Sequence, residues 1–385
     1  MECLCKCILT DYGKTMKCKP SRRQFMAGVT SLAAATAGGL AACRKTRKHP
    51  RSQAKPPTPS TPATPGRSST PTTPRTPPAG AAGRGRVFEA LHAHATDSKD
   101  QPARAPVEAM LDHLLRELTG KRKVDDAWAT LFRPDDVVGI KPNCRGSTWC
   151  SPSPALLDAV IARLVRVGVK PANIIVWELA HFAKHPLYAH LKKSKIQVKL
   201  QDELGFHPKV YKLSTGVGMR FNNAIHRVTA ILNIGTFKDH GRAGVTGALK
   251  NMSYGSIDNP REHHPNCCNP STAEIYALPV LRDKVRLTLA DAFRLIYDRG
   301  PTGFRSREFN IPYNRLYATT DPVALDRELW QAIDAIRKQK GMDLLMKRSV
   351  GGKPVGRPHH VLTAAKLGLG EADYARITVA KKTLG

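Results

Sequence analysis

Residues 235–255 concentrate side chains and backbone that could hold an anion. The stretch contains five glycines, the lysines Lys238 and Lys250, the histidine His240 and the arginine Arg242. Glycine lets backbone N–H groups approach a ligand closely, and lysine and arginine supply positive charge. The Gly-x-x-x-x-Gly-Lys-Ser/Thr order of a Walker loop is absent. The stretch therefore predicts an anion site that is not a Walker loop, with a purely structural glycine-rich loop as the alternative.

Alternating strands and helices are expected around this stretch. Short apolar runs predict strands at 136–140, 173–178, 196–200, 228–234, 285–290, 315–318 and 375–379. Helical spacing and N-terminal signals predict helices at 154–167, 271–281, 322–340 and 359–367, with Ser153 and Asp321 as N-caps and a capping box at Ser271–Glu274. This alternation predicts an α/β fold with a mostly parallel sheet and helices on both faces.

Polar residues follow several of the predicted strands. They are Lys141, Asn143, Glu178, Lys238, His240, Asp291 and Asp321. If the strands are parallel, these residues share the carboxyl edge of the sheet, where open α/β sheets place their ligand crevice. Capping alone is a sufficient explanation for Asp321.

Five segments together resemble the family called domain of unknown function 362, over about Val137 to the C-terminus. They are Val138–Asn143, Ile231–Ile234 with Lys238–His240, Val245–Asn251, Asp321–Asp326, and His359-His360 with Leu367–Gly370. The resemblance implies a shared site formed by Lys141, Asn143, Lys238, His240, Thr246, Lys250 and Asn251, and it implies no particular reaction. Many members add a Cys-x-x-Cys-x-x-Cys-x-x-x-Cys run for an iron–sulfur cluster, and this chain lacks that run.

Four cysteines fall within the predicted α/β region, and they could form a disulfide, remain free thiols or bind a metal. Cys144 and Cys150 are close enough in sequence to close a short disulfide loop. Alternatively, a metal cofactor could be held by His240, His263, His264, Cys267 and Cys268, although their spacing matches no standard zinc pattern.

The N-terminal region resembles a bacterial export signal. Arg22 and Arg23 precede a weakly apolar Ala/Gly-rich run, as in twin-arginine signals, and Leu40–Cys43 resembles a lipobox with Cys43 as the lipidated residue. The resemblance implies the twin-arginine machinery as a partner and a periplasmic or membrane-anchored lipoprotein as the product. Cleavage of the same Ala-rich end by an ordinary signal peptidase is the alternative.

Three regions are expected along the chain. Residues 1–43 are the export signal, 44–86 are a basic Pro/Thr-rich linker with too few apolar residues to build a core, and 87–385 are the α/β domain. Proline-rich linkers favour extended polyproline II structure. Such a segment would hold the domain away from a membrane.

The charge balance invites a nucleic-acid interpretation, which the motifs do not support. The chain carries 61 Lys+Arg against 31 Asp+Glu, a net charge of +30. It has no basic helix, no basic strand with interleaved aromatic residues and no zinc-finger spacing. We therefore expect no nucleic-acid partner, and a membrane surface or a small anionic ligand suits the charge better.

Three functional interpretations remain open. The first is an enzyme that holds an anionic substrate with Lys141, Lys238 and Lys250 and uses His240 and Lys250 in catalysis. The second is a protein with a metal or iron–sulfur cofactor. The third is a non-catalytic binding protein tethered to the cell envelope.

Overall fold

The computed structural model describes residues 83–97, 101–301 and 307–385. The predicted export signal with Arg22, Arg23 and Cys43 lies outside the described residues, as does the predicted linker up to residue 82. Arg86, the predicted end of that linker, is already the first residue of a strand. Among the described residues, no helix combines the length and the apolar character that crossing a membrane requires.

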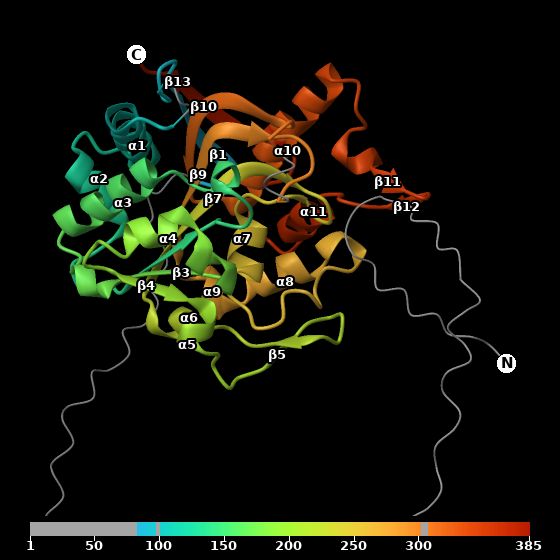
Figure 1. The fold of residues 1–385 in the computed structure, drawn as a ribbon, viewed down its shortest axis with the longest axis horizontal. Coiled ribbons are helices and arrows are strands. Elements are labelled where there is room, and N and C mark those ends of the chain that lie inside the picture. The colour runs from blue at the N-terminus through green and yellow to red at the C-terminus, as the bar shows by residue number, and fades with distance from the viewer. Residues whose placement is uncertain (1–82, 98–100, 302–306) are drawn as a thin grey trace, which may run out of the picture. The chain divides into compact units, whose positions relative to one another are not determined.

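A nine-stranded sheet forms the centre of the fold (Figure 1). Its strand order is β13-β1-β10-β9-β7-β2-β3-β4, with β8 paired to β7. The bounds are β1 Arg86–Leu91, β2 Val138–Pro142, β3 Ile174–Glu178, β4 Gln197–Leu200, β7 Ala230–His240, β8 Gly244–Val245, β9 Val285–Ile296, β10 Asn310–Thr319 and β13 Thr378–Thr383. Two-stranded ribbons pair β5 (Tyr211–Lys212) with β6 (Gly218–Met219) and β11 (Ser349–Val350) with β12 (Lys353–Pro354).

Most neighbouring strands of this sheet run parallel, as the sequence predicts. β9, β7, β2, β3 and β4 are parallel to one another, and β13 is parallel to β1. β10 is antiparallel to both β9 and β1. The carboxyl ends of the five parallel strands therefore meet at one edge, whereas β10 ends at the opposite edge.

Helices cover both faces of the sheet (Figure 1). One face carries α1 (Arg104–Thr119), α2 (Val124–Leu131), α3 (Pro154–Arg166) and α4 (Pro186–Leu191). The other carries α6 (Asn223–Arg227), α7 (Leu249–Tyr254), α8 (Ser271–Ala277), α9 (Pro279–Arg282), α10 (Pro322–Gln339) and α11 (His359–Lys366), and α5 spans Gln201–Leu204. Each face buries its own apolar core, which confirms the predicted fold class.

The predicted N-caps at Ser153 and Asp321 are confirmed. The Ser153 hydroxyl accepts the Leu156 N–H at 3.3 Å, and an Asp321 carboxylate oxygen accepts the N–H groups of Val323 and Ala324 at 3.0 and 2.8 Å. Asp321 lies at the end of antiparallel β10, so its predicted place at the carboxyl edge with the other polar residues is wrong.

The predicted helix at 271–281 is divided into α8 and α9, because Leu278 is extended before Pro279. The capping box predicted at Ser271–Glu274 is also wrong. Pro270 is the N-cap, and Glu274 instead accepts the Ser214 N–H at 3.0 Å. A tertiary contact has therefore replaced the local one.

Candidate functional site

The residues of the predicted anion site gather at the carboxyl edge of β2, β3 and β7. Lys141, near the end of β2, is buried and forms an ion pair with Glu178 at the end of β3, with 2.7 Å between Nζ and Oε2. Its ammonium also donates to Asn251 Oδ1 at 3.1 Å. Burial is the largest effect on the pKa of Glu178 and raises it, but the charge and hydrogen bond of Lys141, with the Cys144 N–H and His181, together leave this pKa below its usual value.

Asparagines dock the loop after β7 and helix α7 against the strand ends. Asn251 donates to Asn233 Oδ1 at 2.8 Å and to the Lys141 carbonyl at 3.0 Å. Asn143 donates to the Thr246 carbonyl at 3.3 Å, while the buried Thr246 hydroxyl oxygen has no hydrogen-bond partner among the described residues. These contacts hold α7 and its Lys250 next to the sheet.

Two further contacts fix the turn that precedes Lys250. The buried Asp326 carboxylate on α10 accepts the N–H groups of Ala248 and Leu249 at 2.6 and 3.0 Å. A Cβ atom on Gly235 would lie 2.5 Å from the Gly247 carbonyl oxygen, so only glycine allows this turn to rest on β7. Sequence patterns did not assign Asp326 to the site, because it lies on a distant helix.

Lys238 on β7 is completely buried and holds the loop that follows β2. Its ammonium donates to the carbonyls of Arg145 and Cys150 at 2.9 and 2.6 Å. Burial lowers the pKa of Lys238 to about 8. No carboxylate within the described ranges forms an ion pair with it. Lys238 therefore adds an unbalanced positive charge to the interior.

Lys250 is the ammonium with the fewest contacts in this cluster. Its side chain is 6% exposed, and its Nζ lies 3.9 Å from the centre of the Tyr254 ring and 3.4 Å from His264 Nε2. Burial lowers the pKa of Lys250 to about 8. As with Lys238, no described carboxylate forms an ion pair with it. A buried cation without a counter-ion is costly unless another group balances it.

Histidines from three segments surround Lys250. His240 Nδ1 accepts the N–H groups of Arg242 and Ala243 at 3.0 and 3.1 Å, which places the proton of the neutral ring on Nε2. The His240 and His264 rings stack with centres 5.9 Å apart. Burial, reinforced by the charge of Lys250, lowers the pKa of both rings, to about 4 for His264. Both rings are therefore neutral donors or acceptors at neutral pH.

His360 on α11 completes this group and was not assigned to the site from the sequence. It is 0% exposed, and neither of its ring nitrogens has a hydrogen-bond partner in the described chain. Burial and the nearby Lys250 charge lower its pKa to about 3. The pair His359-His360 is part of the family-like pattern, but only the fold brings it to Lys250 from the C-terminal region.

Two exposed arginines, Arg145 and Arg242, add charge around the buried lysines. Both are close enough to lower the pKa of Lys250 further, after the larger effect of burial. We call Lys238, Lys250, His240, His264, His360, Arg145 and Arg242 the cationic cluster. Such a concentration of one charge attracts anions from solution and stabilises them when bound.

The predicted metal ligands do not assemble into a site. His263 Nε2 lies 3.2 Å from Asn259 Oδ1, the Cys268 sulfur faces the His264 carbonyl, and the Cys267 sulfur faces the Pro354 carbonyl. Nowhere in the described ranges do three His, Cys, Asp or Glu side chains lie close enough to hold a metal ion. As placed in the described chain, the five predicted ligands therefore do not form a metal or iron–sulfur site.

The predicted Cys144–Cys150 disulfide is not formed. Neither cysteine takes part in a disulfide, and both are buried, as is Cys268, while Cys267 is partly exposed. The Cys144 amide instead donates to Glu178 Oε2 at 3.0 Å, and the Cys150 carbonyl binds Lys238. Separate contacts thus hold the two ends of this loop.

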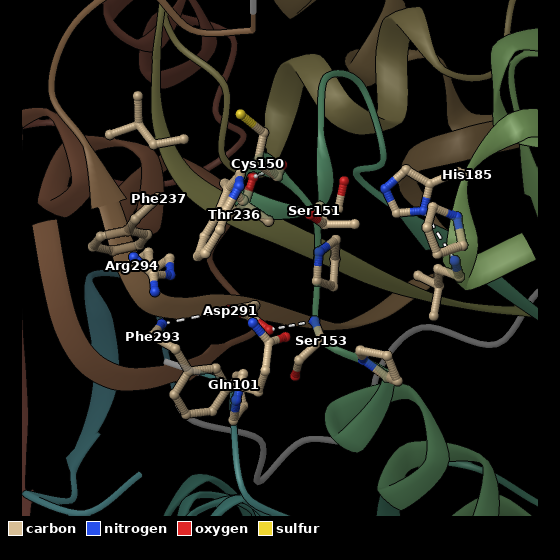
Figure 2. Close-up of a pocket in the computed structure, with 18 residues that line it drawn as sticks. Gln101, Cys150, Ser151, Ser153, His185, Thr236, Phe237, Asp291, Phe293 and Arg294 are labelled. Carbon is tan, nitrogen blue, oxygen red and sulfur yellow. Dashed lines mark hydrogen bonds between the residues drawn. The ribbon is translucent and has the colours of Figure 1, made fainter. Parts of the chain in front are cut away.

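Asp291 does not join the cationic cluster. It lines a separate cavity of about 190 Å³ between the 148–154 loop, residues 185–187 and strands β7 and β9 (Figure 2). Its carboxylate accepts the Ser153 N–H at 2.7 Å and the Phe293 N–H at 3.4 Å. A carboxylate repels anions, so Asp291, a predicted ligand-binding residue at the carboxyl edge, does not contribute to an anion site.

Fold and site together define an α/β protein with a cationic cluster at the carboxyl edge of a mostly parallel sheet. The model of the family described as "Domain of unknown function (DUF362)" matches residues 138–331, about half of the chain. The chain belongs to this family, as the sequence motifs indicate. The match covers β2 to α10 and so includes most of the cationic cluster, but not His360.

Other comparisons add little to this assignment. No curated protein matches the chain. One similar solved structure is that of the lactate racemase apoprotein from Thermoanaerobacterium thermosaccharolyticum, with 12% identity and a TM-score of 0.30. The alignment covers 52% of this chain and 49% of that one, so the likeness is confined to about half of each protein.

Proposed function

We propose that this protein binds a small anionic ligand, with a carboxylate, sulfate or phosphate group, at the cationic cluster. The observation that carries the proposal is the buried Lys250 ammonium, which has no carboxylate counter-ion among the described residues. An anion at Lys250 would balance this charge. The His240 Nε2–H group is a suitable second donor.

Binding is favoured over turnover by the state of His240. A general acid or base works best when its pKa is near the operating pH. Burial and the charge of Lys250 hold the pKa of His240 well below its usual value. The ring is therefore suited to donate a hydrogen bond rather than to exchange a proton, which supports a binding protein over an acid–base enzyme.

The proposal predicts anion binding that weakens in mild alkali. Sulfate and acetate keep their charge between pH 7 and pH 9, whereas Lys238 and Lys250, with pKa values of about 8, lose theirs as the pH rises through this range. Calorimetric titration of the full chain should show an affinity that falls several-fold from pH 7 to pH 9. Circular dichroism would verify that the fold persists. A constant affinity over this range, or no binding of either anion at pH 7, would contradict the proposal.

We further propose that the protein is exported to the cell envelope and anchored there by lipid on Cys43. The twin-arginine pair and the lipobox-like end support this proposal. Replacing Arg22 and Arg23 together by lysine should leave uncleaved protein inside a bacterial host. Cys43→Ala should move exported protein from the membrane fraction to the soluble fraction. Unchanged fractionation of both variants relative to the natural sequence would contradict the proposal.

A further inference from the structure

The cavity that contains Asp291 is a second candidate site, separate from the cationic cluster. The 148–154 loop forms one wall, and its Cys150 carbonyl accepts hydrogen bonds from Lys238 and from Thr236, which also lines the cavity. Most of the lining is apolar, from Trp149, Leu187, Phe237, Phe293, Ile296 and several prolines. A cavity of about 150 Å³ holds a benzene-sized molecule, so about 190 Å³ suits a small substituted ring.

Asp291 is the acidic group among the residues that line this cavity (Figure 2). Its side chain is 7% exposed, and within the described ranges no lysine, arginine or histidine forms an ion pair with it. It accepts the main-chain N–H groups of Ser153 and Phe293, and the Ser153 side chain also interacts with it. These neutral donors leave the carboxylate without a cation and do not use all of its lone pairs, since a carboxylate offers about four acceptor sites.

None of the other ionisable groups that line the cavity forms an ion pair with Asp291 in the described chain. Burial lowers the pKa of His185, whose Nδ1 accepts the Leu187 N–H at 3.1 Å, so this ring is neutral. The Arg294 guanidinium lies over the Trp149 ring, 4.2 Å from its centre. The Cys150 thiol also belongs to the lining. Burial raises the pKa of Asp291 to about 6, against the effect of its hydrogen bonds from Ser153 and Phe293.

We propose that this cavity binds a small primary amine with an aromatic or apolar body, and that Asp291 is the counter-ion of its ammonium group. A buried carboxylate without a cation is a costly arrangement that an ammonium group would relieve. The aromatic and other apolar walls fit the body of such a ligand. The inference does not depend on the cationic cluster, because that cluster would bind anions and this cavity would bind a cation.

Benzylamine is a suitable probe, with benzyl alcohol and benzoate as matched neutral and anionic molecules. Calorimetric titration of the full chain at pH 7 should rank benzylamine first and benzoate last. Asp291→Asn keeps an oxygen for the Ser153 N–H and removes the charge, so benzylamine affinity should fall roughly 30-fold or more. The exposed Asp202→Asn is the control and should leave the affinity unchanged.

A measurement on the unmodified chain keeps the proposal testable if the Asp291 variant does not fold. Benzylamine stays protonated at pH 5–7, whereas Asp291 becomes charged as the pH rises through about 6. Benzylamine affinity should therefore increase several-fold from pH 5 to pH 7. Benzoate binding as tightly as benzylamine, an affinity that is flat with pH, or an unchanged affinity in a folded Asp291→Asn variant would overturn the proposal. Because sulfate binding is measured separately, failure here leaves the anion proposal standing.

Discussion

Replacing Lys250 by glutamine is expected to weaken sulfate binding by roughly 30-fold or more, the effect of removing one partner from a buried charge pair. Glutamine is close to lysine in length and keeps a hydrogen-bond donor, so the substitution tests the charge. Because Lys250 has no carboxylate partner among the described residues, its loss breaks no ion pair within the protein. The folded state should therefore keep its stability while it loses affinity, as titration calorimetry and thermal unfolding would show together.

Lys193→Gln is the matched control, because Lys193 is exposed, follows α4 and is not a member of the cationic cluster. It lowers the net charge of the protein by one, as Lys250→Gln does. It therefore separates a local effect at the cluster from an effect of overall charge. We expect less than a twofold change in sulfate affinity for this variant. Equal weakening in both variants would mean that sulfate responds to overall charge, and Lys250 would then have no special role.

The second large effect concerns stability and the buried ion pair between Lys141 and Glu178. Lys141→Met or Glu178→Gln alone should lower the free energy of unfolding by about 3–5 kcal/mol, because each leaves an unpaired charge in the interior. The double variant should lose clearly less than the sum of the two, since no unpaired charge remains. Urea unfolding followed by circular dichroism measures these differences.

A surface pair provides the control for this cycle. Arg166 and Asp125 are 2.8 Å apart, close to the 2.7 Å of the buried pair, but their side chains are 62% and 46% exposed, so Asp125→Asn should change stability by less than about 0.5 kcal/mol. The dependence of stability on pH provides an independent check. The lowered pKa of Glu178 means that its stabilisation is complete above the usual pKa and is lost as the pH falls through the lowered one. Strict additivity of the two single variants would refute the coupling.

Local sequence patterns were sufficient to predict most strands of the sheet. Short apolar runs identified β2, β3 and β4 to within two residues, and the caps at Ser153 and Asp321 marked the starts of α3 and α10. These signals are local, because a buried strand needs apolar side chains and a helix start needs an acceptor for its free N–H groups. They also predicted that Lys141, Lys238 and Lys250 would lie near one edge, and the fold places them there.

Local sequence patterns do not predict the direction of a strand or the pairing of residues far apart in the sequence. The turn of β10 against β9 moves Asp321 to the opposite edge, and the length of β7 and β9 places Lys238 and Asp291 within strands rather than after them. The ion pair between Glu178 and Lys141 likewise depends on the fold, because the two residues are far apart in the sequence. The same holds for the proximity of His360 to Lys250. The amino-acid sequence by itself determined which charges and donors this protein has. Only the tertiary structure decided which of them are buried without a partner, because burial and pairing depend on residues far apart in the chain.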